Sequence, residues 1–115
     1  MAFAPDGKHL AVGAGNDRTV LVWDLGGDKL KEPIELNAFG EQPAPLVESV
    51  AIAPDSRRLA QCNNDRIILW DIGGKKLKEW RLSGNHIVSL AFAPDGRHLA
   101  AANPNGLVYI LRLPK

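Results

Sequence analysis

The sequence predicts an all-β protein assembled from repeats, and two observations lead to this prediction. The first is a segment of similar sequence that occurs three times, at residues 1–11, 50–60 and 90–100. The copies start 49 and then 40 residues apart, a period typical of repeat architectures rather than of one ordinary core. The second is the alternation of β-branched and aromatic residues in segments such as 19–23 and 66–70, which favours strands over helices.

Short turns separate the predicted strands. In each copy a Pro-Asp-Gly or Pro-Asp-Ser sequence supplies turn chemistry: Pro presets φ, Asp bonds the turn through its side chain, and Gly adopts positive φ at little cost. Glycine pairs at 26–27 and 73–74 interrupt the chain after each Trp-Asp pair. We expect strands in groups of four, four and three, at residues 2–4, 9–14, 19–25, 29–36, 47–53, 58–62, 66–72, 76–82, 87–93, 98–102 and 107–113.

One motif of the repeat resembles a known family. Residues 16–24, Asn-Asp-Arg-Thr-Val-Leu-Val-Trp-Asp, resemble the motif of WD-repeat β-propellers, and residues 64–71 are the same motif one residue shorter. The third copy, at 105–114, has Leu111 where the Trp would be and Arg112 where the Asp would be. This resemblance covers nearly the whole chain. It implies an all-β partial β-propeller of about three blades, each an antiparallel four-stranded sheet, with a three-stranded last blade.

The resemblance also implies that residues 1–115 form a single repeat domain. Blade 1 is expected at about 1–37, a loop at 38–46, blade 2 at about 47–83 and an incomplete blade 3 at about 84–115. We expect both ends to be cut inside a repeat. Propellers usually have about 4–8 blades, so two copies of this chain would make an acceptable ring of six. The chain is therefore expected to be a homo-oligomer, as a dimer, or a part of a longer propeller chain.

The family often ties each blade together with a hydrogen-bonded set that includes a loop Asp and the Trp. The structural repeat residues implied here are Asp17, Trp23, Asp24, Asp65, Trp70 and Asp71. The family's Ser or Thr position on the second strand holds Val12, Gln61 and Ala101, so these blades are expected to depend more on apolar packing. A blade cannot bury its apolar faces alone, so neighbouring blades must stack. Between the blades we place Val12, Leu21, Trp23, Leu69, Trp70, Leu90, Phe92 and Ile110.

Composition excludes several function classes. The net charge of +1, with basic and acidic residues intermixed, gives no electrostatic footprint for nucleic acid or an anionic membrane. No apolar run approaches the length of a membrane span. The single cysteine, Cys62, cannot form an internal disulfide, and this favours a reducing cytoplasm.

The sequence offers no recognisable reaction chemistry. His9 and His98 share a repeat position that Arg58 fills in the middle copy, as expected of solvated turn residues rather than metal ligands. His86 has either a structural role or that of a switch near neutral pH. Cys62 lies on an apolar strand and is interpreted as a small buried hydrophobe. We expect no catalytic residue, no metal site, no cofactor and no enzymatic activity.

The blades of a propeller form a disc, and one face of that disc remains as a candidate binding site. In the family, loops between second and third strands and loops between blades share that face. The candidate partner-binding residues are Asn16, Asp17, Arg18, Phe39, Asn64, Asp65, Arg66, His86 and Asn105. Asn and Asp are also ordinary turn formers, so a purely structural interpretation stays open. We expect a non-catalytic protein–protein interaction scaffold. The alternative is a structural segment of a larger or oligomeric propeller with no partner of its own.

Overall fold

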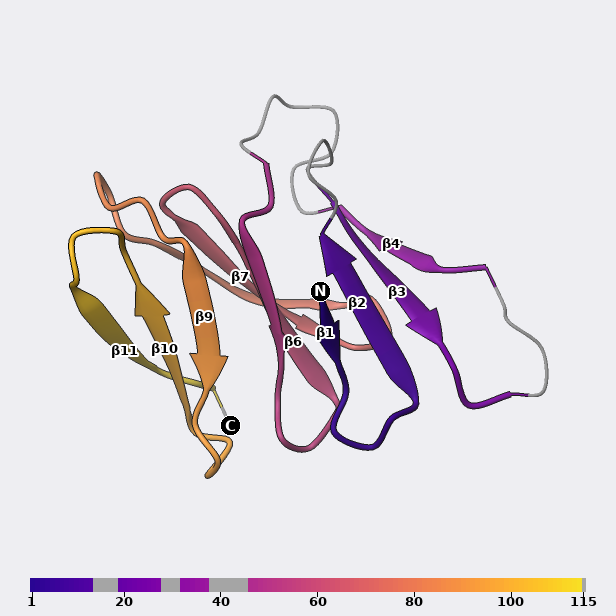
Figure 1. Cartoon of the computed structure of the whole chain (residues 1–115). Helices are drawn as coiled ribbons and strands as arrows, with labels where there is room; N and C mark the ends of the chain where they lie inside the picture. Colours follow the sequence, from indigo (N-terminus) through magenta and orange to yellow (C-terminus); the bar gives the residue numbers. More distant parts are fainter. Residues whose placement is uncertain (14–18, 28–31, 38–45, 115) are drawn as a thin grey trace.

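The structure is a computed structural model that describes residues 1–13, 19–27, 32–37 and 46–114 (Figure 1). The strands are β1 Ala2–Phe3, β2 His9–Gly13, β3 Val20–Asp24, β4 Ile34–Leu36, β5 Ser49–Ile52, β6 Arg58–Asn63, β7 Arg66–Asp71, β8 Lys76–Arg81, β9 Ser89–Phe92, β10 His98–Ala102 and β11 Val108–Arg112. Each lies within a predicted strand or within one residue of it. Residues 38–45 of the predicted loop 38–46 and residues 29–31 of the predicted strand 29–36 lie outside the described residues.

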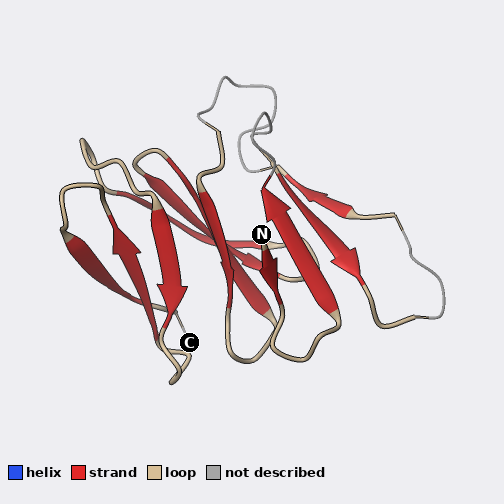
Figure 2. Cartoon of the chain, viewed as in Figure 1, coloured by secondary structure: helices blue, strands red, loops and turns tan. Residues whose placement is uncertain are grey.

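These strands form three antiparallel sheets, each built from strands in chain order (Figure 2). The first blade is β1-β2-β3-β4, the second is β5-β6-β7-β8, and the third is β9-β10-β11. The predicted all-β class and the grouping of four, four and three strands are therefore confirmed. The described residues contain no helix that is long and apolar enough to cross a membrane.

Turn carboxylates shape the repeated hairpins as the sequence indicated. Asp55 Oδ1 accepts the backbone N–H of Arg57 at 2.9 Å, and equivalent bonds form in the first and third copies. The middle copy has Ser56, at φ 61°, where the other two have glycine at positive φ. Ser56 is buried, and its Oγ accepts the backbone N–H of Asp6 at 3.2 Å. This serine therefore links the turns of the first and second blades.

The blades are stacked in a row, with β1, β2 and β5 in contact and β5 against β9 (Figure 1). Two apolar layers hold the row together. The first layer, between the first and second blades, contains Ala11, Val20, Val22, Leu36, Val47, Val50, Leu59, Ile68 and Trp70. The second layer, between the second and third blades, contains Ala60, Cys62, Ile67, Leu69, Ile87, Leu90, Leu99, Ala101 and Leu113.

Each blade thus has two apolar faces. The leading face is turned toward the preceding blade and the trailing face toward the following one. In the first blade, the trailing face forms part of the first layer and the leading face points away from it. Because side chains alternate along a strand, neighbouring residues belong to different faces. In the second blade Leu59 and Trp70 lie on the leading face, whereas Ala60 and Leu69 lie on the trailing face.

This alternation corrects part of the predicted set of interblade residues. Leu69, Trp70, Leu90 and Phe92 lie between blades, as predicted. The prediction is wrong for the other four, which lie on the outer faces of the row: Val12, Leu21, Trp23 and Ile110. Strand alternation identifies apolar residues of one face. It does not say which face has a neighbour.

Candidate interaction surface

Backbone hydrogen bonds bring several loops together at one end of the blades. Asn64 O accepts the backbone N–H of Ile87 at 2.7 Å, and Asp65 O accepts that of Leu82 at 2.7 Å. The β6–β7 turn is therefore fixed beside the segment that joins the second and third blades. Tyr109 Oη donates to Asn85 Oδ1 at 2.8 Å, which attaches β11 to the same segment.

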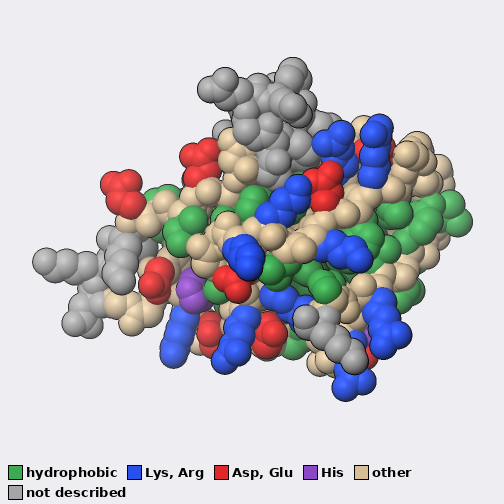
Figure 3. All heavy atoms as spheres, turned by 180° about the vertical axis from the view of Figure 1, so that it is seen from behind, with side chains coloured by type: hydrophobic (Ala, Val, Ile, Leu, Met, Phe, Trp, Pro, Cys, Tyr) green, Lys and Arg blue, Asp and Glu red, His purple; other side chains and the backbone are tan. Residues whose placement is uncertain are grey.

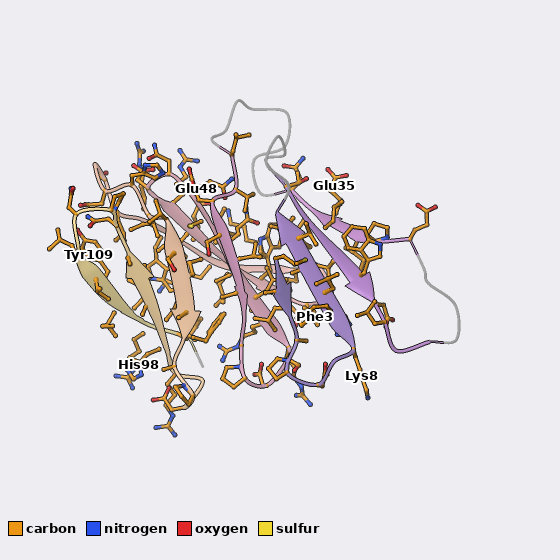
Figure 4. All side chains as sticks on the ribbon, viewed as in Figure 1. Phe3, Lys8, Glu35, Glu48, His98 and Tyr109 are labelled. Carbon is orange, nitrogen blue, oxygen red and sulfur yellow. The ribbon has the colours of Figure 1, made fainter. Side chains whose placement is uncertain are left out.

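We call this end the loop face. Its residues are Glu48, Asn64, Asp65, Arg66, Arg81, Asn85, His86 and Asn105. Glu48 is labelled in the upper part of the view in Figure 4.

Local sequence explains the two hairpin turns on the loop face. β6 and β7 are joined by two residues, Asn64 and Asp65, and Asn64 has a φ of 57°. Asn tolerates positive φ better than most residues, so it suits a two-residue hairpin. At the β10–β11 turn, buried Asn103 accepts the backbone N–H groups of Asn105 and Leu107, both at 3.0 Å. This leaves Asn105 exposed at the tip.

One ion pair and one hydrogen-bonded pair lie across the loop face. Arg81 Nε is 3.3 Å from Asp65 Oδ2, and His86 Nε2 is 3.1 Å from Glu48 Oε1. The Arg81 side chain is 61% exposed, and those of His86 and Glu48 are 48% and 40% exposed. Exposed ion pairs contribute only about 0–1 kcal/mol each. An incoming polar group can therefore replace the Arg81–Asp65 pairing at small cost.

The structure brings five predicted site residues to this one end: Asn64, Asp65, Arg66, His86 and Asn105. The other four lie outside the described residues: Asn16, Asp17, Arg18 and Phe39. Glu48, Arg81 and Asn85 complete the surface and were missed by the sequence analysis. Their only signal in the sequence is their position: Glu48 and Arg81 lie near the ends of predicted strands, and Asn85 lies between two of them.

A buried polar network inside the second blade corrects two expectations. The Trp70 indole Nε1 donates to Gln61 Oε1 at 2.7 Å, and Gln61 Nε2 donates to Asn63 Oδ1 at 2.7 Å. Gln61 thus fills the position where the family has Ser or Thr, and this blade does not rely on apolar packing alone. Asp65 was expected to act with Trp70 but instead pairs with Arg81, because the tight turn directs it toward β8.

The other predicted repeat carboxylates close turns after the Trp. Asp24 Oδ1 accepts the backbone N–H of Gly26 at 2.9 Å, and Asp71 Oδ1 accepts that of Gly73 at 2.7 Å. Both are structural roles. Asp17 lies outside the described residues.

The surroundings of Cys62, His98 and His9 indicate structural roles for these side chains. Burial raises the pKa of Cys62 to about 12, so its thiol is neutral, and Sγ lies 3.4 Å from Ile87 O. The interpretation of Cys62 as a small buried hydrophobe is confirmed. His98 Nδ1 lies 3.3 Å from Asp95 Oδ2, whereas His9 Nδ1 is buried and has no hydrogen-bond partner among the described residues. The described residues include no cluster of three or more His, Cys, Asp or Glu able to hold a metal.

A groove of about 780 Å³ lies at the opposite end, between the second and third blades. It is lined by Asp55, Arg58, Leu77, Gly96, Arg97, Arg112, Leu113 and Pro114. The Arg58 guanidinium donates to Gly96 O at 2.9 Å and to Pro114 O at 3.3 Å. Arg58 therefore joins the second and third blades.

Stacked antiparallel blades with this repeat define a β-propeller type of protein. The family model for the WD domain, G-beta repeat, matches residues 1–24 and 74–110, which is more than half of the chain. The chain belongs to the WD40 repeat family, whose members are typically non-catalytic and commonly serve as protein-interaction scaffolds. The second copy of the motif, at 64–71, lies outside the matched residues. The blade that contains it is nevertheless a four-stranded sheet like the first blade. A comparison with curated proteins finds no match.

Proposed function

We propose that this chain is a non-catalytic protein–protein interaction scaffold and that the loop face is its contact surface. The observation that carries the proposal is the convergence of exposed polar side chains from separate turns at one end of the blades. Backbone hydrogen bonds fix the turns that present them, at Asn64, Asp65 and the 82–87 segment. A surface that is already ordered loses little conformational entropy when a partner binds.

The chemistry of the loop face indicates the kind of partner. Asp65 and Glu48 supply acidic groups, Arg81 a basic group, and the exposed Asn64 and Asn105 supply amides. Both signs of charge are present, so a strongly charged partner is disfavoured. This composition suits a polar protein segment that exchanges hydrogen bonds and ion pairs with the scaffold.

The chain offers a matched pair of variants to test this proposal. The loop-face variant, Asp65→Ala/Arg81→Ala, removes an ion pair of the loop face. The rim variant, Lys76→Ala/Glu79→Ala, removes an exposed ion pair of 2.7 Å on β8, the strand that also carries Arg81. Tagged proteins would be compared by quantitative affinity purification from the native host. We expect partners that the parent and the rim variant retain and that the loop-face variant loses at least tenfold. Equal recovery with both variants, or no partner above a tag-only control, would contradict the proposal.

A second candidate function is the structural one: a segment of a larger or oligomeric propeller with no partner of its own. The observation that favours it is the exposure of large apolar side chains on the outer blades, including Phe3 at 63% and Ile110 at 64%. In that case neither loop-face variant nor rim variant would change any interaction.

A further inference from the structure

The row of blades ends in two apolar faces that no described segment covers. They lie at opposite ends of the row in Figure 1, on the first and third blades. The leading face of the first blade carries Phe3, Leu10, Val12, Leu21 and Trp23. The trailing face of the third blade carries the apolar residues Ala91, Ala100, Ala102, Val108 and Ile110, together with Ser89, His98 and Arg112. Figure 3 shows hydrophobic side chains at the surface over the third blade.

Strand register shows what each outer face corresponds to inside the row. On the first blade, Phe3 is opposite Leu10 and Leu10 is opposite Trp23. On the second blade, Ile52 is opposite Leu59 and Leu59 is opposite Trp70, in the same arrangement. The second blade's leading face, with Ile52, Leu59, Gln61, Ile68 and Trp70, is covered by the trailing face of the first blade.

The outer face of the third blade has a covered counterpart too. Ala91 is opposite Ala100 and Ala100 is opposite Ile110. The matching residues of the second blade, Ala51, Ala60 and Leu69, are covered by the third blade. Both outer faces are therefore copies of faces that the molecule already buries, and each internal layer pairs one leading face with one trailing face.

Size complementarity explains why leading faces pair with trailing faces. The inner two strands of a trailing face carry small residues, as at Ala11 and Gly13 in the first blade. Large residues of the next blade fill the space: a Cβ atom added at Gly13 would lie 2.5 Å from Val47 Cγ1. Alanines occupy the matching strands of the third blade, at Ala91, Ala100 and Ala102. Phe3 and Trp23 of the first blade supply large side chains of the kind that such a surface accommodates.

We propose that the trailing face of the third blade docks on the leading face of the first blade of a second copy. A single chain carries both halves of this interface at opposite ends, so two copies related by a twofold axis would present the same pair of faces to each other. Two copies of three blades make six, within the range of about 4–8 blades for closed propellers, and each copy would cover both outer faces of the other. This inference does not depend on the loop face or on its partner.

Two charge substitutions test the proposal on the full chain. Phe3→Glu alters the leading face and Ile110→Glu alters the trailing face; both side chains are more than 60% exposed, so folding is expected to survive. Leu107→Glu, at a residue 55% exposed in the β10–β11 turn, is the matched control because it lies off both outer faces. Sedimentation velocity would give the mass of each variant, and circular dichroism would check its fold.

We expect a dimer for the parent chain and for Leu107→Glu, and monomers for the other two variants. Each buried, unpaired carboxylate should weaken the dimer on the order of 100-fold or more. A monomeric parent chain, or a dimer that survives in either single variant, would overturn the proposal. A polydisperse parent that neither variant disperses would overturn it as well.

Discussion

Replacing Gln61 with Leu tests the buried network of the second blade, because it removes both polar atoms that Gln61 offers. Trp70 Nε1 then loses its acceptor at 2.7 Å, and Asn63 Oδ1 loses the amide donor at 2.7 Å. Gln61 is fully buried and Trp70 is 5% exposed, so water cannot easily take the missing place. Leu is close to Gln in size, which keeps the cavity contribution small.

The expected loss of stability follows from the desolvated indole N–H. A buried donor without an acceptor costs about 1–3 kcal/mol. Burying a leucine instead of an amide offsets part of this, so we expect Gln61→Leu to lower the free energy of unfolding by about 2 kcal/mol. That is a large fraction of the stability of about 5–15 kcal/mol that small domains have.

Urea denaturation at one fixed protein concentration would measure the loss, and a double-mutant cycle with Trp70→Phe would assign it to the hydrogen bond. In the double variant the indole N–H is absent, so the two losses should fail to add by about 1 kcal/mol. Asn105→Ala, at an exposed turn tip, is the control and should change stability by less than about 0.5 kcal/mol. A Gln61→Leu loss below that limit, or strictly additive losses in the cycle, would refute the reasoning.

Three further predictions concern single side chains. Cys62 should resist thiol reagents in the native protein and react once urea unfolds it, because burial raises its pKa to about 12. An unperturbed thiol has a pKa of 9.0, so the contribution of Cys62 to stability should be complete below pH 9.0 and should decrease as the pH rises toward 12. Urea titrations at several pH values would measure this alkaline loss. The same loss in a Cys62→Ala variant would contradict the prediction. Asp95→Ala should lower the urea midpoint at pH 7, because the hydrogen bond from the backbone N–H of Arg97 lowers the pKa of the Asp95 carboxylate. The difference in midpoint from the parent should shrink as the pH falls below 3.8. A difference that stays constant with pH would refute the assignment. Arg58→Leu should destabilise the protein by about 1–3 kcal/mol in urea, because its hydrogen bonds to Gly96 O and Pro114 O are lost, and an unchanged midpoint would show that Arg58 does not join the blades.

The contacts on the loop face could be predicted only in part. The sequence placed Asn64, His86 and Asn105 at one end, because turn residues of a repeat recur at corresponding ends of the strands. It gave no means of pairing His86 with Glu48, 38 residues away, or Arg81 with Asp65. Such pairs depend on how blades pack and on which way each turn directs its side chains, and neither is encoded in a local pattern.

The sequence by itself determined the repeat, its strands and its turns, because these follow from the two-residue period of a strand and from the backbone preferences of Pro, Asp and Gly. Only the tertiary structure decided which apolar residues have a neighbour. Ile110 and Leu69 hold equivalent positions on trailing faces, yet Leu69 is fully buried and Ile110 is 64% exposed. It also decided that Gln61 hydrogen-bonds with Trp70 and Asn63 inside the second blade. The physical reason is that the burial of a side chain is set by what lies across the space between blades, whereas its hydrogen bonds are set by the side chains that the sheet brings beside it. The alternation along a single strand records neither.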